Sequence, residues 1–234
     1  MIIQMIWRAG CPPYELSWMM NTEEDITLKK EQLRNEIWHL LEEKNVAIFP
    51  LPIRGRIPNF VGSDKAADLV RTLPEWKKAK IIFANPDSPQ RKIREFALRD
   101  GKILIMASPR LKHGFLQIDP EDVRGMEEAA SSIKGAFKYG KPVENPATGG
   151  SGEMPKPDLI IKSCVAVDRS GWRLGKGGGY GDIEVQSIKD EFGEIPVVTT
   201  VHALQLVESV PHVDHDAKVD IIVTPERIYR IRDK

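Results

Sequence analysis

The residues from Asp168 to Asp182, DRSGWRLGKGGGYGD, have the composition of a phosphate-binding loop. Glycine permits positive φ angles and close approach of a ligand to the main chain, and successive N–H groups in such a loop can form a concave anion site. Arg173 and Lys176 add positive charge. The residues that follow, IEVQSIKDEF, are expected to form a helix, and the N-terminus of a helix favours phosphate. We therefore interpret the segment as a phosphate-binding loop with an acid, Asp182, at its end.

A plain strand-to-helix turn is the alternative for this loop, because glycine-rich turns are common. The loop does not match the dinucleotide-binding fingerprint, since the required spacing and the acid about 20 residues further on are not convincingly present. It does not match a Walker A loop either, because no Lys-Ser or Lys-Thr pair closes it. The loop by itself indicates an anion rather than a particular nucleotide.

A second group of residues, VPHVDHDAKVD, suggests a metal site. Its histidines and carboxylates match no closed zinc site, and no cysteine is near. A solvated loop is one interpretation. The other is a hard-cation role, in which Asp182 and Asp216 jointly hold one magnesium ion against a nucleotide.

Basic residues supply further candidates. Lys30 and Arg34 are four residues apart on an expected helix and therefore face the same way, either toward phosphates or toward solvent. Arg54, Arg56 and Arg110 follow expected strands, and ligands in open α/β sheets collect at the carboxyl ends of strands. These arginines suit an anionic substrate, although loop solubility explains them equally well. We interpret Arg91 and Arg94, on another expected helix, as surface charges.

Strands and helices are expected to alternate, which predicts an α/β fold with a mostly parallel sheet and helices on both faces. The expected helices cover residues 22–43, 63–73 and 89–99, and the expected strands cover 46–51, 80–85, 102–107, 158–167, 196–201 and 220–224. We expect residues 1–234 to form one domain, with 1–21 as an N-terminal extension packed on it. The Pro/Gly-rich stretch 138–157 is expected to be a surface loop.

Composition narrows the classes of function. The 34 basic and 34 acidic residues cancel, which gives no support for a general nucleic-acid or membrane-surface role. No apolar run reaches the roughly 18–20 residues that span a bilayer. Cys11 and Cys164 are far apart, and Cys164 lies in an apolar run, so we expect thiols in a reducing compartment. We predict a soluble, cytoplasmic protein with a small-molecule substrate; the sequence leaves its oligomeric state open.

Three segments resemble, in order and spacing, the 5-formyltetrahydrofolate cyclo-ligase family, also called methenyltetrahydrofolate synthetase. They are Lys30-Glu-Gln-Leu-Arg34, the loop from Gly171 to Asp182, and His215-Asp216-Ala-Lys-Val-Asp220. The resemblance covers roughly residues 25–228. The segments IRGRIPNFVG, NPDSPQ and SPRL resemble a divergent branch, the methenyltetrahydrofolate synthetase domain-containing proteins. The resemblance implies a three-layer α/β fold, similar to NagB, RpiA and CoA transferase.

The resemblance also implies an activity: ATP- and magnesium-dependent cyclisation of 5-formyltetrahydrofolate to 5,10-methenyltetrahydrofolate. The implied ATP-binding residues are Lys30, Arg34, Arg173, Leu174, Gly175, Lys176, Gly177, Gly178, Gly179 and Tyr180. The implied magnesium ligands are Asp182 and Asp216, and the substrate candidates are Arg54, Arg56, Asp87 and Arg110. Tyr180-Gly181-Asp182-Ile183 departs from the family's usual Tyr-Tyr-Asp-Arg. The alternatives are ATP chemistry on another small anionic metabolite and a nucleotide-binding regulatory module without turnover.

Overall fold

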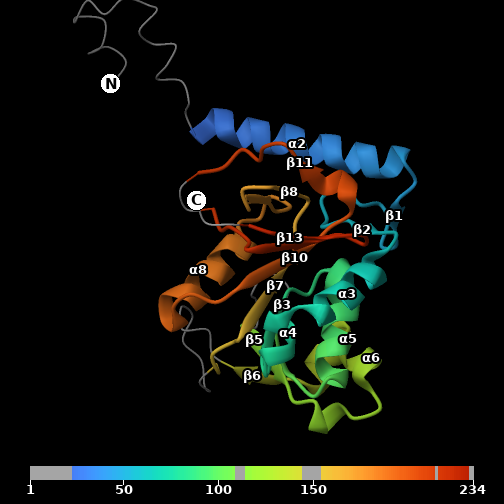
Figure 1. The fold of residues 1–234 in the computed structure, drawn as a ribbon, viewed down its shortest axis with the longest axis vertical. Coiled ribbons are helices and arrows are strands. Elements are labelled where there is room, and N and C mark those ends of the chain that lie inside the picture. Colours follow the sequence, from blue (N-terminus) through green and yellow to red (C-terminus); the bar gives the residue numbers. More distant parts are fainter. Residues whose placement is uncertain (1–22, 109–113, 144–153, 214–215, 232–234) are drawn as a thin grey trace, which may run out of the picture.

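The computed structural model describes residues 23–108, 114–143, 154–213 and 216–231. An eight-stranded sheet in the order β13-β12-β10-β7-β3-β4-β5-β6 forms its centre (Figure 1). Five neighbouring strands run parallel: β12 (Ile221–Val223), β10 (Val197–Thr200), β7 (Leu159–Lys162), β3 (Ile81–Ala84) and β4 (Ile103–Ala107). The outer strands pair in the antiparallel sense: β13 (Ile228–Arg230) with β12, β5 (Phe115–Ile118) with β4, and β6 (Lys141–Val143) with β5. The sheet is therefore mostly parallel, as the sequence predicted.

Helices cover both faces of this sheet. One face packs against α3 (Ser63–Thr72), α4 (Pro74–Lys78), α5 (Arg91–Arg99), α6 (Glu127–Ala130) and α7 (Ile133–Tyr139), and the other packs against α8 (Tyr180–Phe192). Alternate side chains of each strand point to opposite faces. In β3, Ile82 joins the cluster that contains Ile93 of α5, whereas Phe83 joins the cluster that contains Ile188 of α8. The predicted three-layer α/β fold is confirmed.

A long helix, α2 (Glu23–Glu43), lies along a second, smaller sheet. That sheet has the order β11 (Leu206–Val207), β8 (Ala166–Asp168), β9 (Arg173–Leu174). Ile37 and Leu41 of α2 pack in one apolar cluster with Ala166 and Leu174. Because β9 leads directly into the glycine-rich loop, this packing places α2 beside the loop.

The single strand expected over residues 158–167 is wrong. The segment forms β7 in the large sheet and then β8 in the small sheet. The chain leaves the large sheet at Ser163, whose N–H donates to the side-chain oxygen of Asn85 rather than to a neighbouring strand. The break therefore brings Lys162 and Ser163 to the carboxyl end of the large sheet.

Other elements of the structure also differ from those expected. Residues 46–51 were expected to form a buried strand, but only β1 (Ala47–Ile48) forms, pairing with β2 (Asn59–Phe60). Pro50 and Pro52 have no N–H to continue a ladder. The expected loop 138–157 includes the end of α7 and the strand β6, and its residues 144–153 lie outside the described residues, as do 1–21. Short 3-10 helices occur at η1 (Ser88–Gln90), η3 (Glu121–Val123) and η4 (Ala203–Gln205).

The interpretation of Arg94 as a surface charge is wrong, whereas that of Arg91 holds. The side chain of Arg91 is about half exposed, but Arg94 is only 1% exposed. Arg94 Nε donates to the carbonyl of Ser131 at 2.8 Å, and Nη1 donates to the carbonyls of Asn85 and Asp87. Burial lowers the pKa of Arg94 to about 10, so it stays charged at neutral pH. Arg94 therefore holds the loop after β3 in place.

Two further expectations can be compared with the structure. Cys164 is buried, in agreement with its place in an apolar run, and burial raises the pKa of its thiol to about 11. In the described part of the chain, no helix combines the length and the apolar character that crossing a bilayer requires. Cys11 lies outside the described residues.

Candidate functional site

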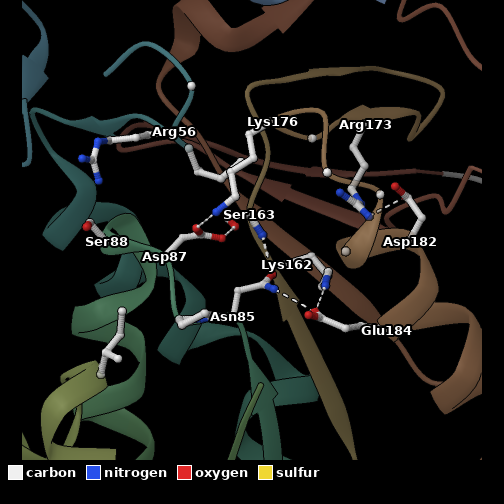
Figure 2. Close-up of a pocket in the computed structure, with 18 of the residues that line it drawn as sticks. Arg56, Asn85, Asp87, Ser88, Lys162, Ser163, Arg173, Lys176, Asp182 and Glu184 are labelled. Atoms are coloured by element: carbon white, nitrogen blue, oxygen red, sulfur yellow. Dashed lines mark hydrogen bonds and ion pairs between the residues drawn. The ribbon is translucent and has the colours of Figure 1, made fainter. Parts of the chain in front are cut away.

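Two cavities lie on opposite sides of the glycine-rich loop Gly175–Gly179. The first, of about 690 Å³, opens at the carboxyl ends of β3, β4 and β7 (Figure 2). The second, of about 720 Å³, lies between α2 and α8. Arg173, Gly175, Gly179 and Asp182 line both cavities. The two cavities therefore share one wall.

The loop in this wall is fixed by α2. Arg34 is buried, and its Nε donates to the carbonyl of Gly175 at 2.8 Å. Gly177 and Gly179 have φ angles of 104° and 70°, which only glycine adopts readily. Gly179 immediately precedes α8, so the loop ends at a helix N-terminus. This is the loop-to-helix geometry that binds phosphate.

The second cavity gathers most of the residues predicted to bind ATP. Lys30 and Arg34 enter it from α2, and Lys30 Nζ donates to Asp216 at 2.5 Å. The other residues predicted to bind ATP that line it are Arg173, Leu174, Gly175, Gly177 and Gly179. Gly178 and Lys176 line the first cavity instead. Tyr180 begins α8, and its side chain lies outside what the structure describes.

The two predicted magnesium ligands, Asp182 and Asp216, both line the second cavity. Asp182 Oδ1 accepts from Arg173 at 2.6 Å and from the N–H of Ala217, while Asp216 Oδ2 accepts from Lys30 and from the N–H of Val213. No described residue donates to the other oxygen of either carboxylate. Magnesium is usually held by one or two carboxylates together with phosphate oxygens and waters. The two carboxylates therefore fit a magnesium ion that is shared with a nucleotide.

The described residues hold no group of three histidine, cysteine or acidic side chains placed to bind a metal. His212, from the segment that suggested a metal, stacks on the ring of Trp172 with centroids 3.9 Å apart. Asp214 and His215 lie outside the described residues. Asp220 accepts from the N–H of Val197 at 2.7 Å, which ties the loop to β10. His212 and Asp220 thus have structural roles.

The first cavity brings together three of the four substrate candidates: Arg54, Arg56 and Asp87. Arg110 lies outside the described residues. Asp87 accepts from the hydroxyl of Ser163 at 2.6 Å with one oxygen and from Lys176 at 2.9 Å with the other (Figure 2). Asp87 therefore connects the glycine-rich loop to the end of β7.

Three residues of the first cavity escaped the sequence analysis: Asn85, Lys162 and Glu184. Lys162 is fully buried, and its Nζ donates to Glu184 Oε2 at 2.6 Å, while Asn85 Nδ2 donates to the same oxygen at 3.1 Å. Burial lowers the pKa of Lys162, and the nearby charge of Arg173 lowers it further against the opposing effect of Glu184. The strand-end rule would have found Asn85. Lys162 lies inside the single strand expected over 158–167, and Glu184 lies inside a helix, so the rule does not point to either of them.

Arg173 occupies the boundary between the two cavities. Its side chain is 2% exposed, and Nη2 donates to Asp182, but no described residue accepts from Nε. A buried donor without a partner is costly, and a bound anion would supply one. A Cβ atom at Gly181 would lie 3.3 Å from Arg173 Nη2 and 3.5 Å from Lys162 Nζ. Two cations thus converge on the first turn of α8.

Comparison of the sequence with known proteins identifies a matching family and several relatives. Residues 26–225 match the model of the 5-formyltetrahydrofolate cyclo-ligase family. The chain is 37% identical over 211 residues to a methenyltetrahydrofolate synthase domain-containing protein of Bos taurus, covering 86% of this chain and 53% of that protein. It is 36% identical over 219 residues to the protein of that name in Mus musculus, covering 89% and 56%. The chain thus spans about half the length of these relatives.

A solved structure supports the fold. The NMR structure of Aquifex aeolicus 5,10-methenyltetrahydrofolate synthetase superposes with a TM-score of 0.56 at 24% identity. The superposition covers 88% of this chain and 94% of that protein. The similarity therefore extends over nearly all of the Aquifex protein.

Proposed function

Because the chain belongs to the 5-formyltetrahydrofolate cyclo-ligase family, we propose that it uses ATP and magnesium to cyclise 5-formyltetrahydrofolate to 5,10-methenyltetrahydrofolate. The pair of cavities that meet at Arg173 and Asp182 is the observation that supports this proposal. A ligase of this kind must bring the terminal phosphate of ATP to a second substrate while it holds both. Two cavities with a common wall provide that arrangement.

In the proposed complex, ATP occupies the second cavity. Lys30, Arg34 and the main chain of the loop 175–179 bind its phosphates, and the N-terminus of α8 adds a favourable dipole. Asp182 and Asp216 hold the magnesium ion, which neutralises part of the phosphate charge. The γ-phosphate then lies at the boundary, beside the unpaired Nε of Arg173.

The folate occupies the first cavity in this proposal. Its formyl oxygen attacks the γ-phosphorus and ADP leaves. The formyl oxygen, which is a poor leaving group, now carries the phosphoryl group and can leave as phosphate. N10 then attacks the formyl carbon, the ring closes, and phosphate leaves with the proton from N10. Arg173 stabilises the negative charge of the phosphoryl group during transfer, and the protein acts mainly by positioning and charge.

A second candidate keeps the ATP chemistry but uses another small anionic metabolite. Five cationic side chains line the first cavity: Arg54, Arg56, Lys162, Arg173 and Lys176. This concentration of positive charge suits any compact carboxylate or phosphate. We propose the cytoplasm as the compartment in either case, in keeping with the free thiol of Cys164.

The proposed function predicts that the purified protein, supplied with ATP, magnesium and 5-formyltetrahydrofolate, forms ADP and the methenyl product in equal amounts. The product is followed by its absorbance, and ADP by a coupled assay. Omission of magnesium should abolish both signals. ATP binding without methenyl formation would reject the folate reaction and favour the second candidate, whereas absence of ATP binding would reject both.

Lys30→Met is expected to weaken ATP–magnesium binding about 10- to 100-fold, since the variant loses a charge-assisted contact to phosphate. Calorimetric titration measures the change. Lys29→Met is the matched control, because Lys29 pairs with Asp25 in solvent and does not line the cavity. Equal affinities of the two variants would remove α2 from the nucleotide site.

A further inference from the structure

The first cavity is lined by a carboxylate with one oxygen to which no described residue donates. Lys162 and Asn85 both donate to Oε2 of Glu184. No described residue donates to Oε1. The Glu184 side chain is only 6% exposed, yet it lines the cavity (Figure 2). Since a carboxylate oxygen is a hydrogen-bond acceptor, Oε1 is a binding position for a ligand that carries a donor.

The surrounding residues fix this oxygen in place. Asn85 is buried; its side-chain oxygen accepts from the N–H of Ser163 at 3.1 Å, and its carbonyl accepts from Arg94. Lys162 is fully buried and supplies the positive charge opposite the carboxylate. The Glu184 carboxylate therefore cannot turn without breaking two hydrogen bonds, so its orientation is set before a ligand arrives.

The other two carboxylates that line the cavity, Asp87 and Asp182, have different hydrogen-bond partners. Both oxygens of Asp87 accept hydrogen bonds, from Ser163 and from Lys176. Asp182 lies at the boundary, paired with Arg173 and facing the second cavity as well. Among these three described carboxylates, only Glu184 combines a fixed orientation, a side chain that is 6% exposed and an oxygen to which no described residue donates.

We propose that Glu184 binds the second substrate by accepting a hydrogen bond from an N–H group, such as the edge of an aminopyrimidinone ring, amide or amidine. This inference rests on the proposed function and states how the second substrate is oriented in the first cavity. The nitrogen-bearing edge faces the floor formed by Glu184, Lys162 and Asn85. The anionic end lies nearer Arg54 and Arg56, whose side chains are exposed. A folate has both kinds of end.

The isosteric variant Glu184→Gln tests the proposal directly. Lys162 and Asn85 both donate to Oε2, so in the variant they bind the oxygen of the new side-chain amide. The NH₂ group of that amide then takes the place of Oε1 and faces the cavity. An N–H donor on the ligand meets another donor, and affinity for 5-formyltetrahydrofolate should fall about 10- to 100-fold. Calorimetry with a non-hydrolysable ATP analogue and magnesium present measures this affinity. The affinity for the analogue itself should change less than about twofold.

A double variant tests the same proposal without leaving a buried charge unpaired, which could prevent folding. Lys162→Met/Glu184→Leu removes both charges together and leaves no buried ion unpaired, which often preserves stability. It should lose folate affinity to the same extent and keep its affinity for the ATP analogue. The matched control is Lys189→Met/Glu194→Leu, which removes an ion pair of 2.8 Å at the far end of α8. This control should bind both ligands as the wild type does.

The outcomes separate the inference from the proposed function. Wild-type affinity for 5-formyltetrahydrofolate in Glu184→Gln or in the double variant overturns the inference, and so does failure of the wild type to bind it. Loss of binding in both variants supports the inference even when the wild type shows no turnover. Turnover of the wild type alone decides the proposed reaction.

Discussion

Replacement of Arg173 by methionine is expected to lower turnover about a thousandfold, the magnitude typical for removal of a charged donor from a phosphoryl-transfer site. Arg173 lines both cavities and presents a buried Nε without a partner among the described residues. No other arginine or lysine of the described chain lines both cavities. Single-turnover measurement of ADP and methenyl formation, at saturating ATP, gives the rate of the chemical steps.

Two variants control this experiment. Arg173→Lys keeps the charge but not the planar set of donors, so its rate should lie between those of methionine and the wild type. Arg169→Met removes a nearby exposed cation, which lies over the ring of Tyr229 and lines neither cavity. A loss of less than tenfold in Arg173→Met, with the fold intact by melting temperature, would place the transferred phosphate elsewhere.

Arg94→Met is expected to lower the free energy of unfolding by about 3–5 kcal/mol, because three carbonyls lose their buried, charged donor. Methionine fills part of the space, so unsatisfied polar groups rather than a cavity dominate the loss. Urea unfolding, followed by circular dichroism, should show a lower midpoint with an unchanged slope.

Arg91→Met provides the comparison on the same helix. Its side chain is about half exposed, and its ion pair with Glu128 spans 3.8 Å, so its removal should cost less than about 0.5 kcal/mol. Equal midpoints for the two variants would mean that Arg94 does not stabilise the loop after β3. The variant Arg94→Met should also weaken folate binding, since that loop carries Asn85 and Asp87.

The regular part of this fold follows from local patterns in the sequence. Short apolar runs, alternating with helical segments, predicted the parallel strands and the helices α2, α3 and α5. The spacing of Lys30 and Arg34 predicted that they share a face, and both line one cavity. Their assignment to ATP, like that of Asp182 and Asp216 to magnesium, stays a prediction.

The charged interior could not be predicted in this way. Lys162 lies in an apolar run, and its partner Glu184 lies 22 residues later on a helix, so no local period marks the pair. Arg94 has the sequence context of a surface residue, and its three carbonyl partners come from two separate places in the chain, the loop after β3 and Ser131. Polarity patterns record which residues prefer water, but not which find compensating partners on folding.

In the proposed complex, the wall shared by the two cavities is expected to couple two binding equilibria. A ligand that engages Arg173 from one side is expected to alter the ion pair with Asp182, and thereby the free energy of binding on the other side. Such coupling is reciprocal: the factor by which nucleotide strengthens acceptor binding equals the factor by which acceptor strengthens nucleotide binding. We therefore expect the Arg173–Asp182 ion pair to contribute to cooperativity between the two substrates in either direction.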